Sequence, residues 1–145
     1  MTITAAQVKE LRERTGLGMM ECKGALAETQ GDMNAAIDLL RKKAGSKVEK
    51  KAGRTASEGA IGVYASPDRK QAVMVEVNSE TDFVAKGDDF QAFANAVAFA
   101  IARHKPADVN AVADIKLESG ETVAKTREGL VAKLGENISV RRFVH

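Results

Sequence analysis

Few side chains in this sequence have the type and spacing that covalent or metal chemistry requires. Cys22 is the single cysteine, which excludes an internal disulfide and a zinc site with four thiolate ligands. The two histidines, His104 and His145, have no sequence partner that suggests a catalytic triad or a metal pair. Nothing matches GxxxxGKS, GxxxxGKT or GxGxxG, the glycine-rich patterns that cradle phosphates. We therefore expect a protein that is not an enzyme and that holds no cofactor or metal.

The strongest candidate for a binding site is the segment Thr81, Asp82, Phe83 and Val84, an apolar pair inside the polar loop 79–87. Composition alone favours Phe83 as a staple folded over the chain's own core. The alternative is an exposed anchor for a partner's pocket, since aromatic residues carry much of an interface's binding energy. Asp82 either caps a helix or turn, or presents negative charge where a partner holds phosphate and metal.

A second candidate is the turn Leu17, Gly18, Met19 and Met20. Met19 falls on the same helical stripe as Cys22, so both are expected in the core, with Cys22 as a small apolar residue rather than a reactive thiol. Met20 lies off that stripe, and flexible methionine side chains suit contact surfaces. Exposed contact and partial burial both stay open for Met20.

The segment 41–54 is basic, with Glu49 as its one acid. Phosphate-backbone binding is one interpretation of such a run. It contains no aromatic residue to stack on bases, so a basic helix end that runs into a solvated linker is favoured.

Three short helices are expected in the first third of the chain. Thr4 followed by Gln7 fits a capping box, and the glycines around Leu17 reverse the chain. A second helix spans about 19–30, and Asp32 caps the third.

After Gly59 the hydrophobic period changes to that of strands. The runs 60–66 and 71–78 are joined by a hairpin turn at 67–70, and alternating valines mark one face of the second run. Asp88 or Asp89 is expected to cap a helix whose buried stripe consists of Phe90, Phe93, Val97 and Ile101. The segment 108–117 is ambiguous, and a helix over about 121–134 precedes a third strand that carries Ile138, Val140 and Val144.

The composition, with 44% hydrophobic and 29% charged residues and a formal net charge of +2, is that of a soluble globular protein and is weak evidence for any one partner. The most apolar stretch, 92–102, is much shorter than the roughly 20 residues of a membrane span. We expect a cytoplasmic protein without a secretory signal or membrane contact.

Two long motifs resemble a known family. The stretch from Val8 to Lys23 is similar to the first signature of bacterial elongation factor Ts, and the stretch from Glu76 to Ala85 is similar to its second. Gly135-Glu136-Asn137-Ile138 also fits. Family members usually continue beyond this length, so we expect a truncated chain that contains the N-terminal domain and the first half of the core.

The resemblance implies an α+β fold: a three-helix ubiquitin-associated-like domain over residues 1–54, a linker at about 44–58, and a small antiparallel sheet packed with helices over residues 55–145. It implies guanine-nucleotide exchange on the GTPase elongation factor Tu. The turn from Leu17 to Met20 would dock on that partner. The segment from Thr81 to Val84 would displace Mg²⁺ from the partner's nucleotide.

Two other functions stay open beside exchange. One is an adaptor with the same domains and a buried Phe83, and the other is a nucleic-acid-binding module that uses residues 41–54.

Overall fold

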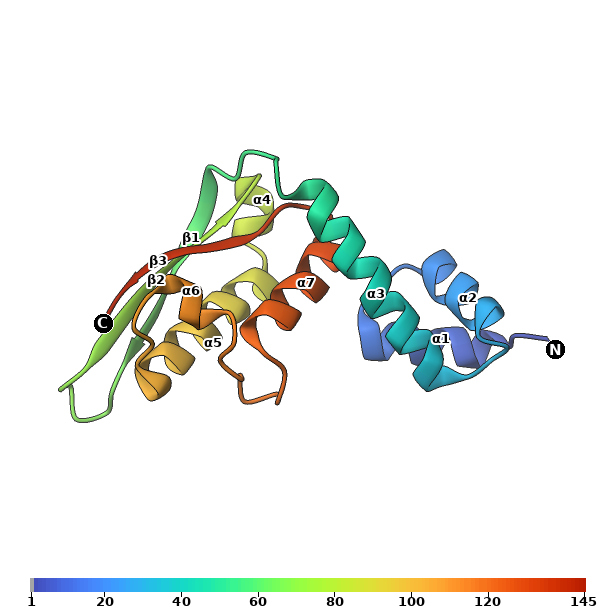
Figure 1. Cartoon of the computed structure of the whole chain (residues 1–145), viewed down its shortest axis with the longest axis horizontal. Helices are drawn as coiled ribbons and strands as arrows, with labels where there is room; N and C mark the ends of the chain where they lie inside the picture. Colours follow the sequence, from blue (N-terminus) through green and yellow to red (C-terminus); the bar gives the residue numbers. More distant parts are fainter. Residues whose placement is uncertain (1) are drawn as a thin grey trace.

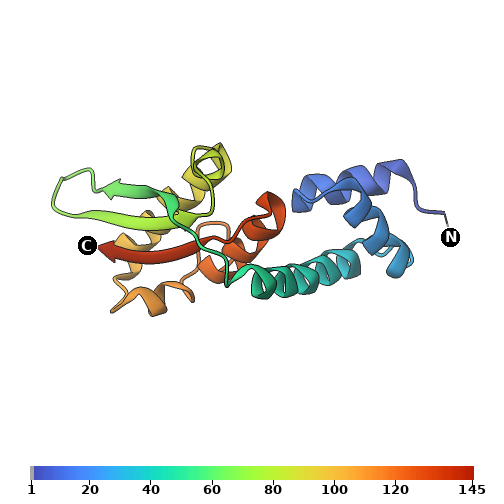
Figure 2. The same ribbon diagram turned by 90° about the horizontal axis from the view of Figure 1, so that it is seen from above.

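The structure is a computed structural model that describes residues 2–145. Within these residues, seven helices and one three-stranded antiparallel sheet confirm the α+β class. Figures 1 and 2 show helices α1 and α2 at one end of an elongated molecule and the sheet at the other, with α3 reaching between them. In chain order the elements are α1 (Ala5–Thr15), α2 (Met19–Glu28), α3 (Met33–Lys51), β1 (Glu58–Ala65), β2 (Ala72–Ser79), α4 (Asp82–Ala85), α5 (Asp88–His104), α6 (Val109–Val112), α7 (Val123–Leu134) and β3 (Ser139–Val144).

The N-caps of α1 and α3 are those that the sequence predicts. Thr4 Oγ1 accepts the Gln7 N–H at 3.2 Å while Gln7 Oε1 accepts the Thr4 N–H at 2.9 Å, which is a complete capping box. Helix α1 ends at Gly16, whose φ of 69° is the left-handed conformation that glycine adopts without steric cost. Asp32 Oδ1 accepts the Ala35 N–H at 3.0 Å and starts α3. A small core joins the three helices, formed by Val8, Leu11, Cys22, Ala25, Leu26, Ala36 and Leu40.

Helix α3 is longer than the sequence suggested. It continues to Lys51 through much of the segment expected as a linker, and only residues 52–57 connect it to β1 without helix or strand. Ala44 and Val48 are buried on this extension, where α3 packs against α7. This packing explains why the helix continues through Gly45, although glycine has a low helix propensity.

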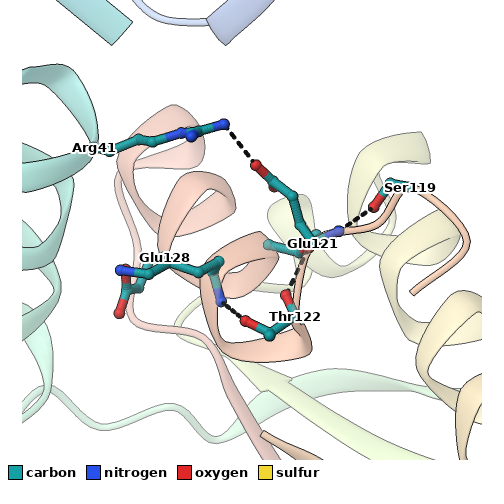
Figure 3. A network of polar contacts seen from close by, with 7 residues as sticks. Arg41, Ser119, Glu121, Thr122 and Glu128 are labelled. Atoms are coloured by element: carbon teal, nitrogen blue, oxygen red, sulfur yellow. Dashed lines mark hydrogen bonds and ion pairs between the residues drawn. The ribbon is translucent and has the colours of Figure 1, made fainter. Parts of the chain in front are cut away.

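A polar network joins α3 to the start of α7 (Figure 3). Arg41 Nη2 lies 2.9 Å from Glu121 Oε1, and the Glu121 N–H donates to Ser119 Oγ at 3.4 Å. Thr122 Oγ1 accepts the Lys125 N–H at 3.2 Å and caps α7. Because the Arg41–Glu121 pair is exposed, its contribution to the free energy of unfolding is small.

The sheet has the strand order β1-β2-β3. The predicted hairpin turn is confirmed: the Ser66 N–H donates to the Gln71 carbonyl at 2.9 Å, and Arg69 adopts a φ of 59° between them. Valines alternate along β2 with buried side chains, while Met74 on the opposite face is exposed. The predicted division of the second strand into a core face and an outer face is therefore confirmed.

Helix α5 covers the inner face of the sheet, and its predicted stripe of Phe90, Phe93, Val97 and Ile101 is buried. The helix approaches β1 so closely that a Cβ at Gly62 would lie 2.1 Å from the Ala94 carbonyl oxygen. The predicted cap of this helix was wrong. The N-cap is Gly87. Asp88 and Asp89 lie in the first turn, where their negative charge interacts favourably with the positive end of the helix dipole.

The last third of the chain completes the core. The ambiguous segment 108–117 contains α6 and a single bridge between Lys116 and Thr122. The predicted helix and third strand are present as α7 and β3, and Ile138 between them is fully buried. In residues 2–145 no helix combines the length and the apolar character needed to cross a membrane.

Candidate functional site

The segment from Thr81 to Val84 is a capped helical turn rather than the loop that the sequence suggested. Thr81 is extended, with φ −123° and ψ 154°, and its Oγ1 accepts the Val84 N–H at 3.3 Å. The four-residue helix α4 follows directly and packs against β1 and β2. The candidate segment is therefore a helical turn that is closed by its own N-cap and packed on the sheet.

Phe83 projects from this turn into solvent, with 85% of its surface exposed. The neighbouring Val84 and Ala85 are buried at 8% and 3% exposure. Successive residues of a helix point about 100° apart, so burying 84 and 85 on the sheet turns 82 and 83 outward. The interpretation of Phe83 as a core staple was wrong, and Phe83 is exposed as the anchor hypothesis requires.

Asp82 lies beside Phe83 and pairs with Lys86 one turn later, with 2.8 Å between Asp82 Oδ2 and Lys86 Nζ. The hydrogen bond and the charge of Lys86 lower the pKa of Asp82, and the backbone N–H of Phe83 adds to this. Both side chains are exposed, so a partner's charged groups can compete for either of them. Asp82 does not cap the helix, because Thr81 does.

The turn from Leu17 to Met20 forms the second exposed apolar surface. Met20 is 74% exposed and Met19 is 57% exposed, whereas Leu17 is half-buried against the three-helix core. The prediction that Met19 lies in the core was wrong. Met19 is the first residue of α2, one turn before the buried Cys22, and its side chain lies outside the three-helix core.

Glu21 fastens this turn to α3. Its carboxylate accepts the Gly18 N–H at 3.4 Å and forms an ion pair with Lys47. The hydrogen bond from Lys47 is the main cause of a lowered pKa at Glu21, and the charge of Lys47 and the bond from Gly18 act in the same direction. Met19 and Met20 thus project from the start of α2, which the Glu21–Lys47 ion pair connects to α3.

The sequence analysis gave no role to two residues of the candidate site. Lys86 had a usable signal, because Asp82 and Lys86 have the i,i+4 spacing of helical ion pairs. Glu136 was named only within a stretch that fits the family: it lies 55 positions from Thr81, yet accepts hydrogen bonds from the Thr81 N–H at 3.0 Å and the Thr81 hydroxyl at 2.7 Å.

The basic run 41–54 is largely paired within the chain. Four of its basic side chains form ion pairs with acids of other elements: Arg41 with Glu121, Lys43 with Glu28, Lys47 with Glu21 and Arg54 with Glu80. These pairs reduce the positive charge available to a phosphate backbone.

Comparison with known proteins gives one family match and several similar proteins. Residues 80–145 match the family described as Elongation factor TS. Over 143 residues the chain is 59% identical to Elongation factor Ts of Thioalkalivibrio sulfidiphilus, covering 99% of this chain and 48% of that protein. It is also 59% identical over 140 residues to Elongation factor Ts of Arthrospira platensis, covering 97% of this chain and 57% of that protein.

A third relative, Elongation factor Ts of Hydrogenovibrio crunogenus, is 54% identical over 142 residues, covering 98% of this chain and 48% of that protein. The chain thus spans about half the length of the curated relatives it matches. The aligned residues include almost the whole of this chain. Along almost its whole length the chain is therefore a homologue of elongation factor Ts proteins, and it matches about half of their length.

Proposed function

We propose that this chain binds the GDP-bound form of the GTPase elongation factor Tu and promotes release of GDP, in translation elongation in the cytoplasm. The observation that carries the proposal is the 85% exposure of Phe83 on a capped turn whose neighbours are buried. A large aromatic side chain held in solvent by a rigid support is typical of an anchor that fills a partner's pocket.

In this proposal the turn carrying Phe83 disturbs the partner's nucleotide site. The phosphates of a bound nucleotide are held by backbone amides and by Mg²⁺, which offsets the negative charge. Phe83 displaces elements that carry metal-coordinating groups, and Asp82 brings a further negative charge toward the phosphates. No covalent step in this chain is needed, so the chain is not an enzyme that converts a substrate.

The turn from Leu17 to Met20 is the proposed docking surface. Met19 and Met20 supply flexible apolar contact area, and the tie from Glu21 to α3 fixes the turn against the rest of the chain. We assign it to a ubiquitin-associated-like three-helix domain over residues 1–54. Residues 55–145, the sheet and the helices packed on it, form the second domain and carry the exchange element.

Release of fluorescently labelled GDP from elongation factor Tu tests the proposal. The whole chain should accelerate release in the presence of Mg²⁺. Because the chain acts by disturbing the metal site, the acceleration factor should shrink when EDTA has already removed the Mg²⁺.

Two other results decide against parts of the proposal. An unchanged acceleration factor in EDTA would rule out the action on Mg²⁺ and leave exchange by another route. Binding without any acceleration would indicate an adaptor.

A further inference from the structure

Glu136 is hydrogen-bonded to Thr81, the N-cap of the turn that carries Phe83, although 55 positions separate the two residues. It lies in the connection between α7 and β3, and each of its carboxylate oxygens accepts one hydrogen bond from Thr81. Oε1 accepts the backbone N–H at 3.0 Å and Oε2 accepts the hydroxyl at 2.7 Å. Hydrogen bonds to a charged acceptor are stronger than those between neutral groups.

The Thr81 hydroxyl links this grip to α4. It donates its proton to Glu136 and accepts the Val84 N–H at 3.3 Å, so the carboxylate orients the group that caps the helix. The Thr81 carbonyl is held as well, because it accepts the Ser79 hydroxyl at 2.9 Å. A helix of four residues does not persist by its own hydrogen bonds, so the direction in which Phe83 points depends on this cap as well as on the burial of Val84 and Ala85.

Glu136 is itself fixed on both sides. Gly135 before it ends α7 with a φ of 78°, and its N–H donates to the Val131 carbonyl at 2.8 Å. After it, the Asn137 side-chain amide donates to the Arg54 carbonyl at 2.8 Å, and Ile138 is fully buried. The backbone at Glu136 is therefore constrained on both sides, and the carboxylate holds Thr81 from a fixed position.

We propose that Glu136 is a positioning residue for exchange: it holds Thr81 so that α4 presents Phe83 in one orientation before the partner arrives. This inference rests on the proposed function of Phe83. Pre-organising a contact residue lowers the entropy cost of binding, and here it directs the aromatic ring toward the site that it must disturb.

The first measurement is amide hydrogen exchange on the chain alone, which needs no partner. Glu136→Ala should accelerate exchange at residues 84–86 about tenfold, since a charge-assisted hydrogen bond is lost, and leave the amides of α5 and β2 unchanged. Glu136→Gln should fall between this variant and the wild type, because one amide oxygen still accepts from Thr81. Glu118→Ala, an exposed glutamate outside both surfaces, is the control that removes the same charge.

The second measurement is release of labelled GDP from elongation factor Tu at saturating chain. Glu136→Ala should slow the accelerated release about tenfold in the wild-type background. On a chain that already carries Phe83→Ala it should have almost no further effect, since two changes that act through one contact are not additive.

Three results would count against the inference. Unchanged hydrogen exchange at residues 84–86 in Glu136→Ala would show that the carboxylate does not hold the cap. Faster exchange throughout the chain would make Glu136 a general stability residue, and equal slowing on both backgrounds would mean that it acts elsewhere than through Phe83. If the wild-type chain failed to accelerate release, the proposed function would fall, and the hydrogen-exchange result alone would decide the role of Glu136 at α4.

Discussion

Replacing Phe83 by alanine separates a binding role from a structural one, because the same substitution at Phe90 gives a control only seven positions away. Phe83 is 85% exposed in the free chain and Phe90 is fully buried. Full burial of a phenylalanine side chain is worth about 1.5–3 kcal/mol, so the small buried part of Phe83 contributes at most about 0.5 kcal/mol to folding. Loss of Phe90 should instead cost about 3–5 kcal/mol, since the substitution also leaves a cavity.

The exchange reaction should show the opposite order of effects. If the exposed surface of Phe83 is buried in a pocket of elongation factor Tu, its removal should cost about 2 kcal/mol of the free energy gained there, which is roughly a thirtyfold loss of acceleration. Phe90→Ala, measured on the fraction that stays folded, should keep its acceleration.

Urea denaturation followed by circular dichroism measures the change in the free energy of unfolding. Release of labelled GDP measures the loss of acceleration. The reasoning would be refuted if Phe83→Ala lost as much stability as Phe90→Ala, or if it kept the full exchange activity of the wild type.

Three further predictions concern other parts of the molecule. Gly62→Ala should lower the free energy of unfolding by about 1–3 kcal/mol, because the new Cβ meets the carbonyl of residue 94. Gly129→Ala should instead raise the free energy of unfolding by about 0.5–1 kcal/mol, because this glycine lies inside α7 with open space around it. Urea denaturation of both variants checks the two opposite signs. Met20→Ala should raise the chain concentration needed for half-maximal GDP release and leave the saturating rate unchanged, and a lowered saturating rate would contradict a pure docking role. Glu21 has a pKa below its ordinary value of 4.5 in the folded chain, so the Lys47 pair stabilises the fold above that pH and is lost as the pH falls through the lowered value. The stability gap between wild type and Glu21→Gln should therefore be present at neutral pH and close as the pH falls through the lowered pKa of Glu21, and a gap that stayed open in acid would mean that the charge of Glu21 is not its cause.

Local signals in the sequence were sufficient for most of the fold. The capping box at Thr4, the cap at Asp32 and the alternating valines of β2 depend on residues within a few positions of one another, so their patterns are legible without tertiary information. The same holds for the buried stripe of α5.

The errors occurred where tertiary packing overrides the local pattern. Met19 has the helical spacing of a core residue, but its side chain is 57% exposed at the start of α2. Phe83 is apolar, yet Val84 and Ala85 are the residues buried against the sheet, and the larger Phe83 side chain points into solvent. The bonds from Glu136 to Thr81 close a loop of 55 positions, and no local pattern encodes such a contact.

The affinity of this chain for elongation factor Tu without nucleotide, compared with its affinity for the form bound to Mg²⁺ and GDP, tests the central claim most directly. Linkage requires that a factor which weakens nucleotide binding is itself bound more weakly when nucleotide is present, and by the same ratio. Titration calorimetry should therefore give tighter binding to the nucleotide-free form, with a ratio that shrinks toward one for Phe83→Ala. Equal affinity of the wild-type chain for both forms would contradict the account and leave a docking protein that does not act on the nucleotide.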